Sequence, residues 1–138
     1  MDHRQHFYDR YTTAQSRFAS IDDTRARVAV EHLGLEASVA HLLPTNYAAR
    51  IVDLGCGYGA FLLLVQKKGF SNLRGVDLSP EQIQLAKELG LSCVEVDSLF
   101  LALQSEHNVS LITMFDVIEH LTRSEASRWD SDLANAKY

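Results

Sequence analysis

The sequence predicts an α/β fold built on an open, doubly wound parallel sheet, with four strands visible and a helical cap before them. Three observations lead to this prediction. An apolar strand at residues 51–54 runs into three glycines at alternate positions. From residue 50 onward, continuous apolar runs alternate with helical segments, as expected for a parallel sheet covered on both faces. Each of these runs ends close to an aspartate.

The N-terminal part is predicted to be a helical cap, residues 1–44 of a single domain 1–138. Aromatic residues between positions 3 and 19 recur at roughly helical spacing, so their rings either pack on the domain or form a lid, with Tyr8 and Tyr11 as the lid candidates. Asp22, Asp23 and Thr24 supply helix-capping and first-turn chemistry.

Two helical pieces follow in the cap. The first is expected from Ala26 to Leu33, with Gly34 ending it, and the second from Glu36 to Leu43, stopping before Pro44. The core-facing side chains of this stretch are expected to be Val28, Leu35, Val39 and Leu42.

The core at 50–138 alternates strands with helices. The strands are predicted at 51–54, 73–77, 93–96 and 110–115. The helices are predicted at 60–68 and 80–89, with a helical turn at 99–103 and a last helix running through Trp129 and Leu133. Gly69 and Gly90 stand just past helix ends, and Ser79 with Pro80 forms a helix start. Thr122 and Glu125 have the spacing of a capping box for the last helix.

The strand ends carry the candidate site. Gly55, Gly57 and Gly59 allow a tight turn and close approach of a ligand to the backbone, and the helix that follows presents its positive end. Ligands of such sheets bind beyond the carboxyl ends of the strands. Asp53, Asp77, Asp97 and Asp116 stand at these ends, and Asp77 follows Gly59 by about the offset at which a carboxylate accepts ribose hydroxyls. The pattern favours a nucleotide-like cofactor.

Composition narrows the function classes. The 138 residues carry a formal net charge of -5 and the sequence pI is about 5.6, which argues against nucleic acid as the main partner. No apolar run reaches the length of a membrane span, so we expect a cytoplasmic protein with no membrane partner. Cys56 and Cys93 are expected to be free thiols, and no histidine grouping suggests a metal.

A nicotinamide dinucleotide is the first rival cofactor, since Gly55, Gly57 and Ala60 satisfy a loose G-x-G-x-x-A pattern. About fifty residues precede the glycine strand, however, and Asp53 stands two residues before the first glycine. A carboxylate there suits an ammonium group better than a pyrophosphate. An NAD-dependent oxidoreductase is kept as the lesser alternative.

Four motifs, in order, carry a family resemblance. The stretch 52–59 (VDLGCGYG) resembles the first motif of class I S-adenosylmethionine-dependent methyltransferases, and 75–82 (GVDLSPEQ) resembles their second. The stretch 94–97 (VEVD) is similar to the third motif, and 115–121 (FDVIEHL) to the fourth, in its small-molecule branch form. The resemblance implies a Rossmann-like fold with S-adenosylmethionine as cofactor and S-adenosylhomocysteine as product.

Site roles follow from the resemblance. Asp53 would hold the cofactor's amino group, Asp77 the ribose hydroxyls, and Asp97 the adenine amino group. Leu78 would pack on adenine, while Phe115 and Asp116 would lie at the methionine end. The implied cofactor-binding residues are Asp53, Gly55, Cys56, Gly57, Asp77, Leu78, Asp97, Ser98, Phe115 and Asp116. His120, with Glu119 as a weaker candidate, would serve as catalytic base for a small-molecule acceptor.

The resemblance also implies a seven-stranded sheet, of which this chain supplies four strands. We therefore expect a chain truncated after the fourth strand, with the strand at 110–115 left at a sheet edge. An exposed apolar edge invites association, so a homo-oligomer through this edge or through the C-terminal helix is expected. A catalytically incomplete S-adenosylmethionine-binding module is the main alternative to an active enzyme.

Overall fold

Four parallel strands form one sheet at the centre of the structure, a computed structural model that describes residues 20–135. The strands are β1 (Ile51–Leu54), β2 (Leu73–Asp77), β3 (Val94–Val96) and β4 (Leu111–Thr113). Their order is β3-β2-β1-β4, so the chain moves outward from β1 to β3 and then returns to add β4 on the other side of β1. The predicted α/β doubly wound, Rossmann-like fold is confirmed.

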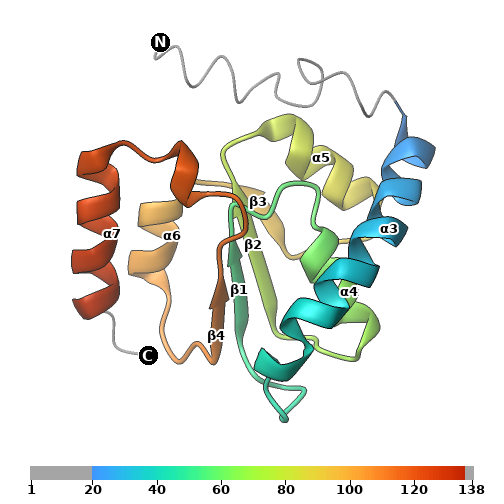
Figure 1. Cartoon of the computed structure of the whole chain (residues 1–138), viewed down its shortest axis with the longest axis horizontal. Helices are drawn as coiled ribbons and strands as arrows, with labels where there is room; N and C mark the ends of the chain where they lie inside the picture. The colour runs from blue at the N-terminus through green and yellow to red at the C-terminus, as the bar shows by residue number, and fades with distance from the viewer. Residues whose placement is uncertain (1–19, 136–138) are drawn as a thin grey trace.

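Helices cover both faces of the sheet (Figure 1). One face carries α3 (Ile21–Val39), α4 (Ala60–Lys67) and α5 (Pro80–Glu88), and the other carries α6 (Leu99–Ser105) and α7 (Arg123–Asn135). Two short 3-10 turns, η1 (Ala40–Leu42) and η2 (Ile118–His120), complete the described elements. Because side chains alternate along a strand, β1 contributes to both hydrophobic cores, Ile51 to one and Val52 to the other.

The helix ends follow the predicted capping chemistry. The Ser79 hydroxyl accepts the Gln82 amide at 3.3 Å, and Pro80 opens the helix. Gly69 and Gly90, each with φ +107°, end α4 and α5. The Thr122 amide donates to the Glu125 carboxylate at 2.7 Å while the Glu125 amide donates back to the Thr122 hydroxyl at 3.3 Å, which confirms the capping box.

Three expectations for the cap are wrong. The helix expected to end at Gly34 continues through it to Val39, because Gly34 keeps helical backbone and a glycine costs an interior helix position only about 1 kcal/mol. The N-cap is Ser20, whose hydroxyl accepts the Asp23 amide at 3.1 Å, whereas the predicted acidic first turn of Asp22 and Asp23 is confirmed. Leu42 is exposed rather than core-facing, since it falls in η1 beyond the helix.

β4 is an edge strand, as expected. Among the strands described in residues 20–135, β4 pairs with β1 and no other, and the predicted strand 110–115 forms ladder hydrogen bonds there over Leu111–Thr113. Its residues are half-buried where those of β1 are fully buried. In the register of this pair Asp53 lies beside Thr113. Among residues 20–135, no helix has the length and apolarity needed to cross a bilayer.

Gly75 on β2 lets α4 approach the sheet. A Cβ at this position would lie 2.4 Å from Leu62 Cδ1 and 3.0 Å from both Cys56 Sγ and Val94 Cγ1, all in close-packed surroundings. We expect Gly75→Ala to lower the unfolding free energy by about 1–3 kcal/mol through overpacking. Urea denaturation of the 138-residue chain measures this.

Gly34→Ala is the matched control, because nothing lies within 4 Å of a Cβ there and the backbone is helical. This substitution should raise the unfolding free energy by about 0.5–1 kcal/mol. Equal stability of Gly75→Ala and the unchanged chain would contradict the described packing of α4 on β2.

Candidate functional site

A cavity of about 550 Å³ opens at the carboxyl ends of β1 and β4. It lies where the chain turns from β1 toward one side of the sheet while β4 is added on the other, the switch point at which ligands of doubly wound sheets bind. Six predicted cofactor-binding residues line it: Asp53, Gly55, Cys56, Gly57, Phe115 and Asp116. Its volume falls within the range of roughly 300–1,000 Å³ that is typical of small-molecule sites.

The glycine loop is fixed to β2 by its own amides. The N–H groups of Gly55 and Cys56 both donate to the Val76 carbonyl, at 2.8 and 2.9 Å, and Gly57 N–H donates to the Asp77 carboxylate at 2.9 Å. Gly55 has φ +75°, and a Cβ on it would lie 2.4 Å from Val117 Cγ2. The loop therefore has one backbone path, and side chains larger than hydrogen are excluded at its first glycine.

Asp77 joins this loop to the next helix. One carboxylate oxygen accepts the Gly57 amide, and the other accepts the Ser79 amide at 2.8 Å, at the start of α5. Burial raises the pKa of Asp77, and the backbone N–H groups of Ser79, Gly57 and Leu78 oppose that shift by stabilising the charge. Leu78 lies half-buried beside it. The carboxylate predicted to face a ligand thus also holds the loop in place.

Asp53 is the most buried carboxylate of the site, with 3% of its surface exposed. The Thr113 hydroxyl of β4 donates to its Oδ1 at 2.8 Å. Burial raises the pKa of Asp53 to about 7; the Thr113 hydrogen bond lowers it and the negative charge of Asp77 raises it further. At neutral pH the side chain is therefore divided between its charged and neutral forms, at the bottom of the cavity.

The segment after β4 forms the wall facing the loop. The Phe115 ring packs against Phe61 of α4, with centroids 5.3 Å apart, and Asp116 is exposed at the cavity. Asp116 has φ +53°, a left-handed conformation that aspartate tolerates better than most residues. Cys56 is buried beneath the loop, and that burial raises the pKa of its thiol well above the usual value, so the sulfur stays protonated at neutral pH.

Asp97 and Ser98 lie at the end of β3, and neither is among the residues that line the cavity. The Asp97 amide donates to the Asp77 carbonyl at 3.2 Å, and the Asp97 carboxylate accepts the Ser98 amide at 2.7 Å. The three strand ends of β1, β2 and β3 therefore form one continuous edge, with the cavity at its β1 end.

The predicted catalytic residues lie elsewhere. Glu119 and His120 are exposed on η2, and neither is among the residues that line the cavity. Their catalytic role stays a prediction. Tyr8 and Tyr11 fall outside the described residues. Within 20–135, His, Cys, Asp and Glu side chains form no group of three that could hold a metal ion.

One side of the cavity is formed by α3, which the sequence did not predict. Arg27 and Glu31, one helical turn apart, line the cavity together with Tyr58 of the glycine loop. The Tyr58 hydroxyl donates to Glu31 Oε1 at 2.5 Å, and Arg27 Nε donates to the same oxygen at 2.9 Å. His32 contacts the Ala60 carbonyl at 2.8 Å, at the start of α4. The i, i+4 spacing of Arg27 and Glu31 marked them as neighbours on a helix, but only the fold shows what that helix covers.

A family model described as a methyltransferase domain matches residues 17–127, most of the chain. The chain belongs to the methyltransferase domain family. The predicted resemblance to class I methyltransferases is therefore confirmed at the level of family and fold.

Solved structures share the fold of this methyltransferase domain. An S-adenosylmethionine-dependent methyltransferase from Archaeoglobus fulgidus has a TM-score of 0.63 at 21% identity, over 80% of this chain and 49% of that one. Magnesium protoporphyrin IX methyltransferase from Synechocystis, with bound S-adenosylhomocysteine, has a TM-score of 0.68 at 19% identity, over 97% of this chain and 66% of that one.

Among curated proteins, human EEF1A lysine methyltransferase 2 is 40% identical over 60 residues. The matched segment is 41% of this chain and 25% of that protein. The methyltransferase domain described here thus spans a quarter of this curated relative and about half of the Archaeoglobus structure.

The raised pKa of Asp53 predicts a stability that depends on pH. The folded chain keeps a proton on Asp53 up to about pH 7, whereas the unfolded chain loses it near 3.8, so stability falls as pH rises between these values. Asp53→Asn should therefore be more stable than the unchanged chain at pH 8, by about 2 kcal/mol, with the difference shrinking toward pH 5. Urea denaturation at both pH values measures it.

Asp116→Asn is the control, because it removes an exposed carboxylate from the same cavity and asparagine also tolerates positive φ. We expect little change in stability at either pH. A destabilised Asp53→Asn at pH 8, or an equal gain at both pH values, would show that Asp53 is not strained by its burial.

Proposed function

We propose that this domain binds S-adenosylmethionine in the switch-point cavity and transfers its methyl group to an acceptor. The observation that carries the proposal is the buried Asp53 carboxyl beside a glycine loop that is fixed to Asp77. A cavity with a carboxylate at its base complements a ligand that carries an ammonium group. The Thr113 hydroxyl bonds to Oδ1 of Asp53, and an ammonium group complements the other carboxylate oxygen.

The remaining cofactor roles are proposals of the same kind. Each oxygen of Asp77 accepts one backbone amide and, with two lone pairs, retains capacity for a ribose hydroxyl. Gly55 and Gly57 would pass the backbone along the methionine part, and Leu78 would cover the adenine. Asp97 and Ser98, next along the strand ends, would meet its amino group.

The chemistry needs alignment more than acid–base groups. When bound, S-adenosylmethionine supplies an electrophilic methyl group on a good leaving group. Phe115 and Phe61 wall the cavity with apolar rings that exclude water, and Asp116 lies where the acceptor would enter. His120 and Glu119 remain the proposed bases, and their exposed position on η2 requires the acceptor to reach over that turn.

We propose a small-molecule acceptor, on the resemblance of residues 115–121 to the small-molecule branch. The lysine methyltransferase that shares 40% identity over 60 residues favours a second candidate, a protein lysine side chain. The net charge of -5 fits a basic protein surface as acceptor. A binding module without activity stays the third possibility, because this chain spans about half of the Archaeoglobus structure that it matches.

Calorimetric titration with S-adenosylhomocysteine and with NAD tests the cofactor. We expect binding of the former only, weakening as pH falls from 8 to 6, because Asp53 then gains a proton and loses its attraction for the ammonium group. Asp53→Asn should bind about tenfold more weakly at pH 8 and show a flat pH dependence. Asp130→Asn, which removes an exposed carboxylate on α7, should match the unchanged chain.

Binding of NAD in place of S-adenosylhomocysteine would overturn the proposed cofactor. For the acceptor, radiolabelled methyl transfer into a metabolite extract is compared with transfer into a protein extract. Label in small molecules supports the first candidate, label on lysine supports the second, and cofactor binding without any transfer supports the inactive module.

A further inference from the structure

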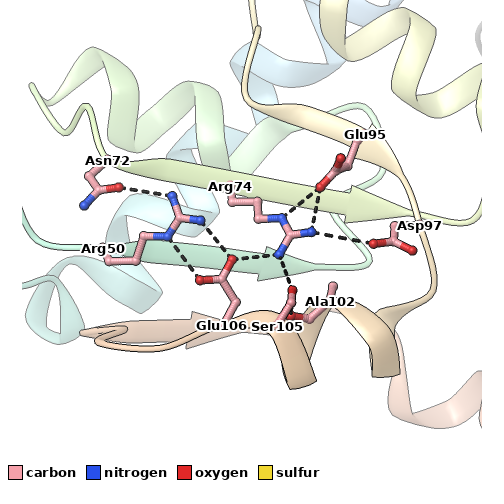
Figure 2. A network of polar contacts seen from close by, with 8 residues as sticks. All are labelled: Arg50, Asn72, Arg74, Glu95, Asp97, Ala102, Ser105 and Glu106. Atoms are coloured by element: carbon pink, nitrogen blue, oxygen red, sulfur yellow. Dashed lines mark hydrogen bonds and ion pairs between the residues drawn. The ribbon is translucent and has the colours of Figure 1, made fainter. Parts of the chain in front are cut away.

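A network of charged side chains lies on the α6 face of the sheet and runs from Arg50 and Asn72, just before β1 and β2, to Asp97 at the end of β3 (Figure 2). Arg74 of β2 is at its centre, on the same face as Val76, which packs against α6. The Arg74 side chain is 18% exposed. A guanidinium in this position does not contact the cavity, and the function proposed above leaves it without a role.

Three carboxylates surround the Arg74 guanidinium. Its Nε and Nη2 donate to Glu95 at 2.9 and 2.6 Å, and its Nη1 donates to Glu106 at 2.8 Å and to the Ser105 hydroxyl at 3.0 Å. The third carboxylate is that of Asp97, whose Oδ2 lies 3.6 Å from Nη2. Because Glu95 and Glu106 bind the planar Arg74 guanidinium from two sides, its orientation is fixed. Its positive charge therefore faces Asp97 in one geometry.

Glu106 holds the Arg74 guanidinium in place. Its side chain is 5% exposed and lies between two guanidinium groups, since Arg50 donates to it at 2.8 and 3.3 Å (Figure 2). Burial acts to raise the pKa of Glu106, and the hydrogen bonds from Arg50 and Arg74 outweigh it and lower the pKa below its usual value. The Nη1 of Arg50 also donates to Oδ1 of Asn72 at 3.1 Å. Glu106 therefore binds both guanidinium groups and fixes Arg74 in place.

Asp97 connects this network to the proposed site. Its Oδ1 is occupied by the Ser98 amide, and its own amide donates to the Asp77 carbonyl. Oδ2 faces Arg74, and the side chain remains 33% exposed. Because its amide bonds to the Asp77 carbonyl, Asp97 is the next carboxylate along the strand ends after the one proposed to hold the ribose.

We propose that Arg74 is a positioning residue that holds Asp97 as a hydrogen-bond acceptor and so makes the site select a 6-aminopurine over a 6-oxopurine. This inference rests on the function proposed above. A fixed carboxylate accepts a hydrogen bond from the 6-amino group of a purine. A 6-oxo group at the same place is also an acceptor, so the two oxygens repel each other. A carboxylate free to rotate turns away and discriminates less.

The test compares the affinities of the chain for S-adenosylhomocysteine and for S-inosylhomocysteine by calorimetry, at pH 8 where Asp53 is mostly charged. We expect the unchanged chain to prefer the adenosyl ligand, and Arg74→Gln to reduce that preference about three- to tenfold. Arg50→Gln is the matched control. It removes the other guanidinium from Glu106 without touching Asp97, so it should lower the melting temperature and keep the preference.

A double-mutant cycle shows whether Arg74 acts through Asp97. Asp97→Asn should reduce the preference by itself, and Arg74→Gln added to it should reduce it no further. If Arg74→Gln does not fold, Arg74→Lys and Arg50→Lys replace the pair. One ammonium cannot contact Glu95, Glu106 and Asp97 together, so Arg74→Lys should still lose preference and Arg50→Lys should keep it.

An unchanged preference in Arg74→Gln, an equal loss in Arg50→Gln, or additive losses in the double variant would each overturn this inference while leaving the cofactor in place. A chain that binds neither ligand would overturn the proposed function, and this inference with it.

Discussion

Hydrogen bonds between the glycine loop and β2 determine the geometry of the site. A loop of three glycines has more conformational freedom than most segments, and this one is confined by the Val76 carbonyl and the Asp77 carboxylate. Since Asp77 also accepts the Ser79 amide, the same side chain fixes the start of α5. The path of the loop, the direction of α4 and the place of the cavity all follow from this bonding.

The buried Asp53 carboxyl lowers the stability of the folded chain. A carboxyl group buried like Asp53 would be replaced by an apolar or amide side chain if stability alone were at stake. Thr113 on the edge strand offsets part of the cost with one hydrogen bond. A positive group that entered the cavity, as proposed above, would recover the remaining cost and would link ligand binding to folding stability through Asp53.

Most of the fold could be predicted from the sequence, because the signals for its helices and strands come from residues close together in the chain. Apolar runs, Gly69, Gly90 and the Thr122 capping box each define an element from neighbouring residues, and the structure confirms them. The predicted helix end at Gly34 is wrong because a glycine does not by itself end a helix, and α3 continues through it to Val39. The aspartates at strand ends were found by position, and Arg27 and Glu31 have a local signal in their i, i+4 spacing. The contact of Tyr58 with Glu31 and the Arg74 network join segments far apart in the chain, for which the sequence has no local signal.

We propose that the buried Asp53 carboxyl is the counter-charge of a cationic ligand at the switch point. Carbon-13 NMR of the labelled side chain measures its pKa directly, in the free chain and in the chain saturated with S-adenosylhomocysteine. We expect a pKa of about 7 in the free chain and a clear fall of this pKa on saturation, because the ammonium group favours the carboxylate. An ordinary aspartate value in the free chain, or no change on saturation, would contradict it.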